Sequence, residues 1–342
     1  MYSERSDFGE WDFYKLIYCD GSSFMGKRSE SIVHGKNEYF MRGYYNFLDL
    51  RDAIFENFDV APKNVVLAGM SAGGLAVMHH CDNFNYWLNN IRFQGHPEIN
   101  VKCISDGSWF VDIPGVDSNG HNALMNAFRD LVNLHNMTLN DGCLNKYKHI
   151  GELFDAEGKL VMNQPSMCFL PRHGGQFVKT PILFIQSAYD TWLSASVWMS
   201  GKHFGKGKRL SHRNQCTNIG ECKDEHVLRQ VQLYDWIGRD SLIEFLTESH
   251  HSVWRQICVT HGNTNNAMYE TIEIGNLKMR DAIWDFVMCN RTIHAIDGFW
   301  QVPINDTLVR KCTVRENEKT KIDKFFEMEK YYTNTIYIFL YK

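Results

Sequence analysis

Short runs of β-branched and apolar residues alternate along the chain with longer amphipathic stretches. The runs with the length and composition of buried strands are NVVLA (64–68), VKCIS (101–105), TPILFIQSA (180–188) and RQICVT (255–260), with a shorter one, KLIYC, at 15–19. The apolar spacing predicts helices at 41–58, 72–88, 121–135, 224–247 and 277–288. This alternation predicts an α/β fold, with a mostly parallel sheet that carries helices on both faces.

The first buried run leads directly into Gly69-Met70-Ser71-Ala72-Gly73 and then into a predicted helix. A Gly-x-Ser-x-Gly segment between a strand and a helix is typical of a sharp turn that exposes a serine hydroxyl above the sheet. Ser71 is therefore a candidate nucleophile. The alternative is that Ser71 only caps the amino end of the helix.

A nucleophilic serine needs a histidine to accept its proton and a carboxylate to orient that histidine. On such a sheet these groups follow in the order serine, acid, histidine, in loops after later strands. Asp190 follows the buried run at 180–188, and His261 follows the run at 255–260. We therefore predict Ser71, Asp190 and His261 as the catalytic residues.

Other titratable groups are weaker candidates. Asp106 also follows a strand, and a structural role at the Gly107 turn is an equally good interpretation. His79 and His80 lie on the helix after Ser71 and should point away from its hydroxyl, and His250 and His251 precede the last buried strand. Cys258 lies three residues before His261, but no second pair has matching spacing, so we predict no metal site.

Composition limits the classes of partner. The chain has 342 residues, of which 44% are hydrophobic and 22% charged, with a formal net charge of −4. Such a chain offers no basic footprint for nucleic acid, and no apolar run is long enough to span a membrane. The start of the chain does not have the pattern of a signal peptide. Ten cysteines and the glycosylation sequons at Asn136, Asn290 and Asn305 instead suggest an oxidising compartment.

The alternating pattern ends at about residue 311. We predict one α/β domain over 1–311 and an atypical, loosely packed tail over 312–342, for which the pattern suggests no partner strand.

Six segments in this order resemble the plant pectin acetylesterases, a carbohydrate-esterase family that also includes the Wnt deacylase Notum. The segments are YCDGSSFMG, RGYYNFLDLRDAI, LAGMSAGGLAVMHHCD, KCISDGSWFVDIPG, TPILFIQSAYDTW and CVTHG. The resemblance implies an α/β-hydrolase-like fold and places the family's nucleophile, acid and base at Ser71, Asp190 and His261. It also implies a secreted cell-wall enzyme that acts as a monomer, uses no cofactor or metal, and removes acetyl groups from pectin.

The sequence departs from the family pattern in two ways. Members carry a Gly-Gly-Gly-Trp-Cys segment, upstream of the start of this chain, whose backbone N–H groups complete the oxyanion hole. The sequence therefore looks N-terminally truncated, with the N–H of Ala72 as the one oxyanion donor that can be assigned. At two positions where the family pattern has cysteine, this chain has glycine instead, namely Gly262 and Gly298. We expect disulfides between Cys143 and Cys168 and between Cys216 and Cys222, with Cys19 left without a partner.

Three functions follow as alternatives. The first is a serine carboxylesterase that deacetylates pectin. The second is a catalytically impaired fragment or pseudoenzyme without its oxyanion loop, and the third is a Notum-like lipid deacylase with an apolar pocket beside Ser71.

Overall fold

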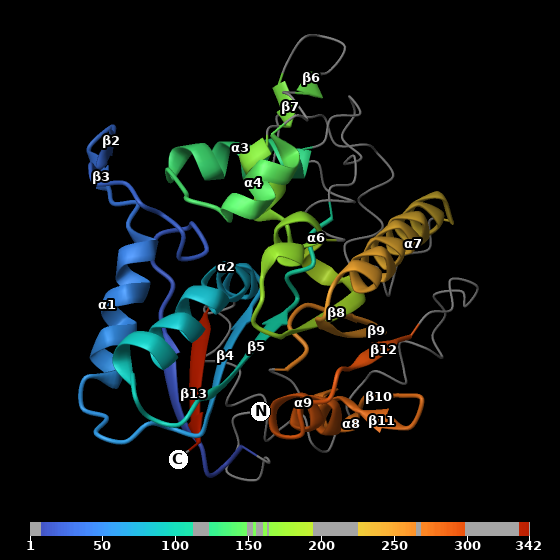
Figure 1. Cartoon of the computed structure of the whole chain (residues 1–342). Coiled ribbons are helices and arrows are strands. Elements are labelled where there is room, and N and C mark those ends of the chain that lie inside the picture. Colours follow the sequence, from blue (N-terminus) through green and yellow to red (C-terminus); the bar gives the residue numbers. More distant parts are fainter. Residues whose placement is uncertain are drawn as a thin grey trace.

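The computed structural model describes residues 8–111, 123–148, 153–154, 160–162, 164–193, 225–264, 268–297 and 335–341. Seven strands form the main sheet, in the order β1-β13-β4-β5-β8-β9-β12 (Figure 1). They are β1 (Asp12–Leu16), β13 (Ile336–Tyr341), β4 (Asn64–Met70), β5 (Asn100–Asp106), β8 (Ile182–Asp190), β9 (Ser252–Thr260) and β12 (His294–Ile296). From β4 to β12 all neighbours are parallel, which confirms the predicted α/β class.

Three small two-stranded sheets lie outside the main sheet. They are the pairs β2 (Ile32–His34) with β3 (Asn37–Tyr39), β6 (Leu153–Phe154) with β7 (Leu160–Met162), and β10 (Glu273–Ile274) with β11 (Leu277–Lys278).

The longer helices fall close to the positions that the apolar spacing predicts. They are α1 (Gly43–Phe55), α2 (Ala72–Trp87), α3 (Ala123–Leu134), α7 (Glu225–Glu248) and α9 (Met279–Met288). The shorter ones are α4 (Asp141–Tyr147), α5 (Gln164–Phe169), α6 (Pro171–Gly174), α8 (Met268–Thr271), the π-helical turn η1 (Leu88–Arg92) and the 3₁₀ turn η2 (Gly175–Phe177). None of these described helices combines the length and apolar character that a membrane-spanning segment needs.

Side chains alternate between the two faces of each strand, so the sheet has two cores. On one face Val65 and Leu67 of β4 share a cluster with residues of α1, α2 and α7. On the other face Val66 and Ala68 pack in a separate cluster with α9 (Figure 1). Helices therefore cover both faces, as the sequence predicts.

The expectation of a loosely packed tail is wrong for its last residues. Ile336–Tyr341 forms β13, which pairs antiparallel with both β1 and β4. Ile336, Ile338 and Leu340 lie in one core, and Tyr337 and Phe339 in the other. The segment has a strand-like composition, but its partners lie at the other end of the chain, so the local pattern gave no sign of them. The domain boundary near residue 311 stays a prediction, since 298–334 lie outside the described residues.

Two disulfides join pairs of described cysteines, one between α2 and β5 and one between α4 and α5. Cys143 is bonded to Cys168, as predicted, and Cys81 of α2 is bonded to Cys103 of β5. Cys216 and Cys222 lie outside the described residues. Cys19 is a free, exposed thiol, as expected, and so is Cys289.

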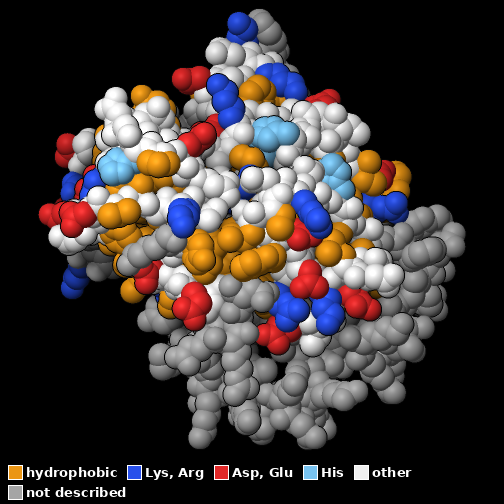
Figure 2. Space-filling view, turned by 60° about the horizontal axis from the view of Figure 1, so that its bottom comes forward, with side chains coloured by type: hydrophobic (Ala, Val, Ile, Leu, Met, Phe, Trp, Pro, Cys, Tyr) orange, Lys and Arg blue, Asp and Glu red, His pale blue; other side chains and the backbone are white. Residues whose placement is uncertain are grey.

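Charged side chains of both signs are mixed on the molecular surface. On the face drawn in Figure 2, lysine and arginine lie among aspartate and glutamate, and a band of hydrophobic side chains crosses between them. This mixture agrees with the small net charge of −4.

Candidate active site

Ser71 stands at the junction between β4 and α2 in a strained backbone conformation. Its φ is 57° and its ψ is −121°, which a non-glycine residue adopts only when its surroundings enforce it. Its side chain makes no capping hydrogen bond, so the simple N-cap interpretation is wrong. A side chain at Gly69 would collide with the carbonyl oxygen of Gly73, and one at Gly73 with the carbonyl oxygen of Thr335 in the segment that enters β13. The glycines are thus required by the close packing of the turn.

Asp190 and His261 meet at the carboxyl ends of β8 and β9. The Nδ1 of His261 lies 2.7 Å from Oδ2 of Asp190. Asp190 is fully buried, and its Oδ1 also accepts the backbone N–H groups of Trp192 at 2.9 Å and Leu193 at 3.0 Å. These bonds fix the carboxylate, which in turn fixes the histidine ring, with Nδ1 as the donor and Nε2 left to accept a proton.

The surroundings of His261 change its proton affinity in opposing directions. Burial lowers the pKa of His261, but the hydrogen bond to Asp190 and the negative charges of Asp190 and Asp106 raise it. The net result is a raised pKa. The carboxylates therefore stabilise the imidazolium that forms when the ring takes up a proton.

Asp106, at the end of β5, ties the serine turn to the histidine loop. Its backbone carbonyl accepts the N–H of Ser71 at 2.8 Å. Its buried carboxylate accepts the N–H of Asn263 at 2.7 Å and the N–H and hydroxyl of Thr264 at 2.7 and 2.8 Å. Asn263 also donates through its side-chain amide at 2.8 Å. The sequence offered a structural role at the Gly107 turn; the contacts instead show a clamp on the residues that follow His261.

Two glycines permit the close approach of these loops. A Cβ at Gly107 would lie 3.3 Å from the backbone nitrogen of Gly262 and 3.5 Å from Nδ1 of His261. Gly262 has a φ of +79°, and a Cβ there would collide with the sulfur of Met70. A side chain at position 262, such as the cysteine that the family resemblance implies, would therefore not fit this packing. Gly298, the other departure, lies outside the described residues.

Of the other histidines considered above, His79, His80 and His251 pack against buried aromatic rings, whereas His250 is exposed and contacts the carbonyl of Lys179 at 2.7 Å. His80 donates a ring N–H to the carbonyl of Phe24 at 2.8 Å and stacks on Phe47, and burial lowers its pKa to about 3. His79 contacts the carbonyl of Phe169, and burial lowers its pKa to about 4. His251 is also buried, and stacks on Phe245.

The described part of the chain contains no set of side chains arranged to bind a metal ion. Cys258, the one cysteine considered beside His261, is bonded in a disulfide. No three His, Cys, Asp or Glu side chains among the described residues come together as ligands would.

The structure thus brings Asp190 and His261 into direct contact and links the loops of Ser71 and His261 through Asp106. Ala72 is the first residue of α2, where the backbone N–H has no acceptor within the helix. This N–H can therefore donate to an oxyanion, and that role stays a prediction. The clamp by Asp106 was missed because it depends on two residues, Asn263 and Thr264, whose sequence gives no sign of it.

Comparison with known proteins agrees with this architecture. The family model for pectinacetylesterase matches residues 2–309. Pectin acetylesterase 4 of Arabidopsis thaliana is 28% identical over 86% of this chain and 66% of its own length, and pectin acetylesterase 7 is 28% identical over 72% and 55%. The chain thus spans between about half and two thirds of these two relatives.

Among solved structures, the Wnt deacylase Notum from Drosophila has a similar fold. Its TM-score is 0.61 at 18% identity, over 84% of this chain and 71% of that chain. The family model matches nearly the whole chain, so this chain belongs to the pectinacetylesterase family, whose members are carboxylic ester hydrolases.

Proposed function

We propose that this chain is a serine carboxylesterase that removes acetyl groups from pectin, with Ser71 as nucleophile, His261 as general base and Asp190 as the group that orients it. The observation that carries the proposal is the 2.7 Å bond from His261 to a fully buried Asp190, on a loop that Asp106 ties to the strained turn of Ser71. The choice of acetylated pectin rests on the names of the relatives.

The chemistry follows from these positions. The Ser71 oxygen attacks the acetyl carbonyl while His261 takes the serine proton, and the resulting imidazolium lies against the charge of Asp190. The ester bond breaks, and His261 returns the proton to the departing sugar oxygen. Water, deprotonated by His261, then attacks the acetyl-enzyme, which releases acetate and restores the serine hydroxyl. The N–H of Ala72 stabilises the negative charge on the carbonyl oxygen in both steps.

We expect the enzyme to work outside the cell. The Cys81–Cys103 and Cys143–Cys168 disulfides suit an oxidising compartment. The resemblance of this chain to plant pectin acetylesterases also implies a cell-wall enzyme. We further expect a monomer, without a cofactor.

The decisive experiment compares this chain with its Ser71→Ala variant. Acetate release from acetylated pectin and hydrolysis of p-nitrophenyl acetate should fall by about 10⁴-fold or more in the variant. Ser29→Ala, a change of an exposed serine in a surface loop, is the matched control and should keep full activity.

Other results would favour the other functions. Equal, background rates in both folded proteins would favour an impaired member of the family. Serine-dependent hydrolysis of long-chain acyl esters, with acetyl esters left intact, would favour a lipid deacylase.

A further inference from the structure

A broad groove lies at the far end of α2 from Ser71. It has a volume of about 950 Å³ and runs between the last turns of α2, the start of α4 and the segment that leads into β8. Because a helix rises about 1.5 Å per residue, Tyr86 in this groove lies about 20 Å along α2 from Ser71. The groove is thus separate from the candidate active site.

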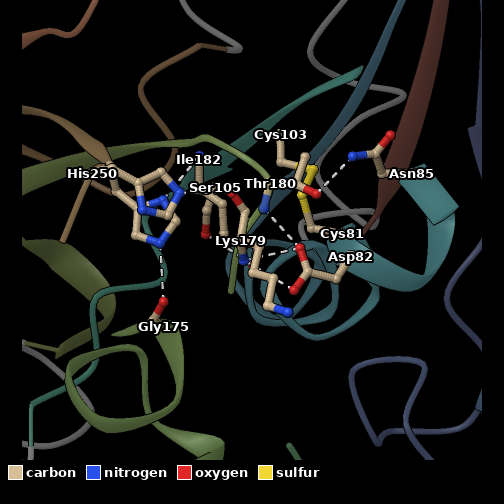
Figure 3. Close-up of a disulfide and its surroundings, with 12 residues drawn as sticks. Cys81, Asp82, Asn85, Cys103, Ser105, Gly175, Lys179, Thr180, Ile182 and His250 are labelled. Carbon is tan, nitrogen blue, oxygen red and sulfur yellow. Dashed lines mark hydrogen bonds between the residues drawn. A yellow bond between two sulfur atoms is a disulfide. The ribbon is translucent and has the colours of Figure 1, made fainter. Parts of the chain in front are cut away.

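The floor of the groove is firmly held. The Cys81–Cys103 disulfide joins α2 to β5 next to Asp82, one of the lining residues (Figure 3). The carboxylate of Asp82 accepts the backbone N–H groups of Lys179 at 2.9 Å and Thr180 at 2.7 Å, and Asn85 donates to the hydroxyl of Thr180 at 3.0 Å. Figure 3 shows these side chains converging from α2 on the segment before β8. The groove therefore keeps its shape without a ligand.

The ends of the groove are fixed in the same way. Asn89 accepts the N–H of Ile99 at 2.8 Å, and Asn140 caps α4 by accepting the N–H of Gly142 at 2.8 Å. A second cavity of about 260 Å³ shares Asp82, Asn83, Asn140 and Asp141 with the groove and extends it toward Lys27 and His79. By volume, the whole depression is large enough for a ligand of several rings.

Polar groups on the wall remain free for such a ligand. Within the described part of the chain the side chains of Asn83 and Glu98 make no hydrogen bond, and Tyr86 is 61% exposed. An amide both donates and accepts, as a sugar hydroxyl does. A tyrosine ring offers a flat apolar face for the C–H groups of a pyranose, with a hydroxyl at its tip. Amides around an exposed ring are therefore suited to a carbohydrate.

Charge narrows the class of carbohydrate. The groove is lined by three carboxylates, Asp82, Glu98 and Asp141, against one ammonium group, that of Lys179. A chain of ionised uronates would be repelled, whereas neutral sugars would not. A cation is no better candidate, because these carboxylates do not gather as metal ligands within the described residues.

We propose that this groove binds an uncharged stretch of glycan and so holds the polysaccharide while an ester is cleaved elsewhere on it. The choice of methyl-esterified galacturonan as the glycan rests on the proposed function. The groove itself does not, because its shape, charge and aromatic ring are independent of Ser71.

The test measures binding without turnover. Ser71→Ala protein is titrated calorimetrically with a galacturonan octamer, once fully methyl-esterified and once unesterified. We expect the esterified octamer to bind at least tenfold more tightly. Adding Tyr86→Ala should weaken its binding tenfold or more, whereas the matched change Tyr39→Ala, at a tyrosine 42% exposed on β3, should not.

Each outcome has a distinct meaning. In a protein with Ser71 intact, Tyr86→Ala should raise KM for polymeric pectin while hydrolysis of p-nitrophenyl acetate stays unchanged. Equal binding by the Tyr86→Ala protein, or tighter binding of the unesterified octamer, would overturn the groove proposal. Binding that depends on Tyr86 in a protein without esterase activity would support the groove and reject the proposed function.

Discussion

The two sides of β4 are built from different parts of the chain and do different work. On one side β5, β8 and β9 run parallel to β4, and their carboxyl ends present Asp106, Asp190 and the loop of His261. On the other side β13 runs antiparallel and brings a backbone carbonyl, that of Thr335, against the serine turn. One side therefore carries the proposed catalytic groups, and the other supplies burial and support.

The strongest test of this contrast changes the chemical side alone. Asp190→Asn should lower kcat by about 10⁴-fold, about 5 kcal/mol of activation free energy, because the amide favours the wrong histidine tautomer. His261 must be neutral to accept the serine proton, and its pKa is raised, so the acidic limb of the wild-type profile should lie above about 6.5. In the Asp190→Asn variant the negative charge is lost, so the acidic limb of the pH–rate profile for the remaining activity should move to lower pH. A limb that stays in place would contradict the assignment of His261 as the base.

The supporting side should respond in stability instead of rate. Ile338 of β13 is fully buried. Ile338→Ala should lower the free energy of unfolding by about 2–5 kcal/mol, measured by urea denaturation, and leave kcat per folded molecule unchanged. The milder Ile338→Val should cost about 0.5–1.5 kcal/mol. A drop in kcat without a loss of stability would show that β13 takes part in the chemistry.

The smallest expected effect on the rate concerns the link between the two loops. Asp106→Asn places an amide against the donors of Asn263 and Thr264, so the loop of His261 should loosen. We expect kcat for p-nitrophenyl acetate to fall about 10- to 100-fold, about 1.4–2.7 kcal/mol, with little change in KM. Asp82→Asn alters a carboxylate with similar backbone partners far from Ser71, and should leave this rate unchanged. Equal effects of the two variants would mean that Asp106 contributes stability only.

The same contrast explains which features could be predicted. β4, β5, β8 and β9 are coded by local apolar runs, and each follows the previous one through a helix, so their parallel order can be deduced from the sequence. Once that order is known, the residues just beyond the strands fall on one edge of the sheet. Ser71, Asp190 and His261 could be proposed on that ground.

Features that depend on distant pairing could not be predicted. β13 reads as a strand, but nothing near it in the sequence indicates that it enters between β1 and β4. The Cys81–Cys103 bond joins a helix to the next strand, and spacing alone does not distinguish it from other pairings. The groove near Tyr86 likewise draws its lining from four separate segments. These features depend on contacts between residues that are distant in the sequence, and local propensity does not indicate such contacts.

The position of β13 also determines when the sheet can form during synthesis of the chain. Among the described strands of the sheet it is the last to leave the ribosome, yet it lies between β1 and β4, which emerge early. Until it arrives, the nascent chain holds the exposed edge of β4 and an unpaired β1, both open to association with other chains. We therefore expect the first half of this protein to depend on chaperones during translation, and the sheet to close only after synthesis has passed residue 341.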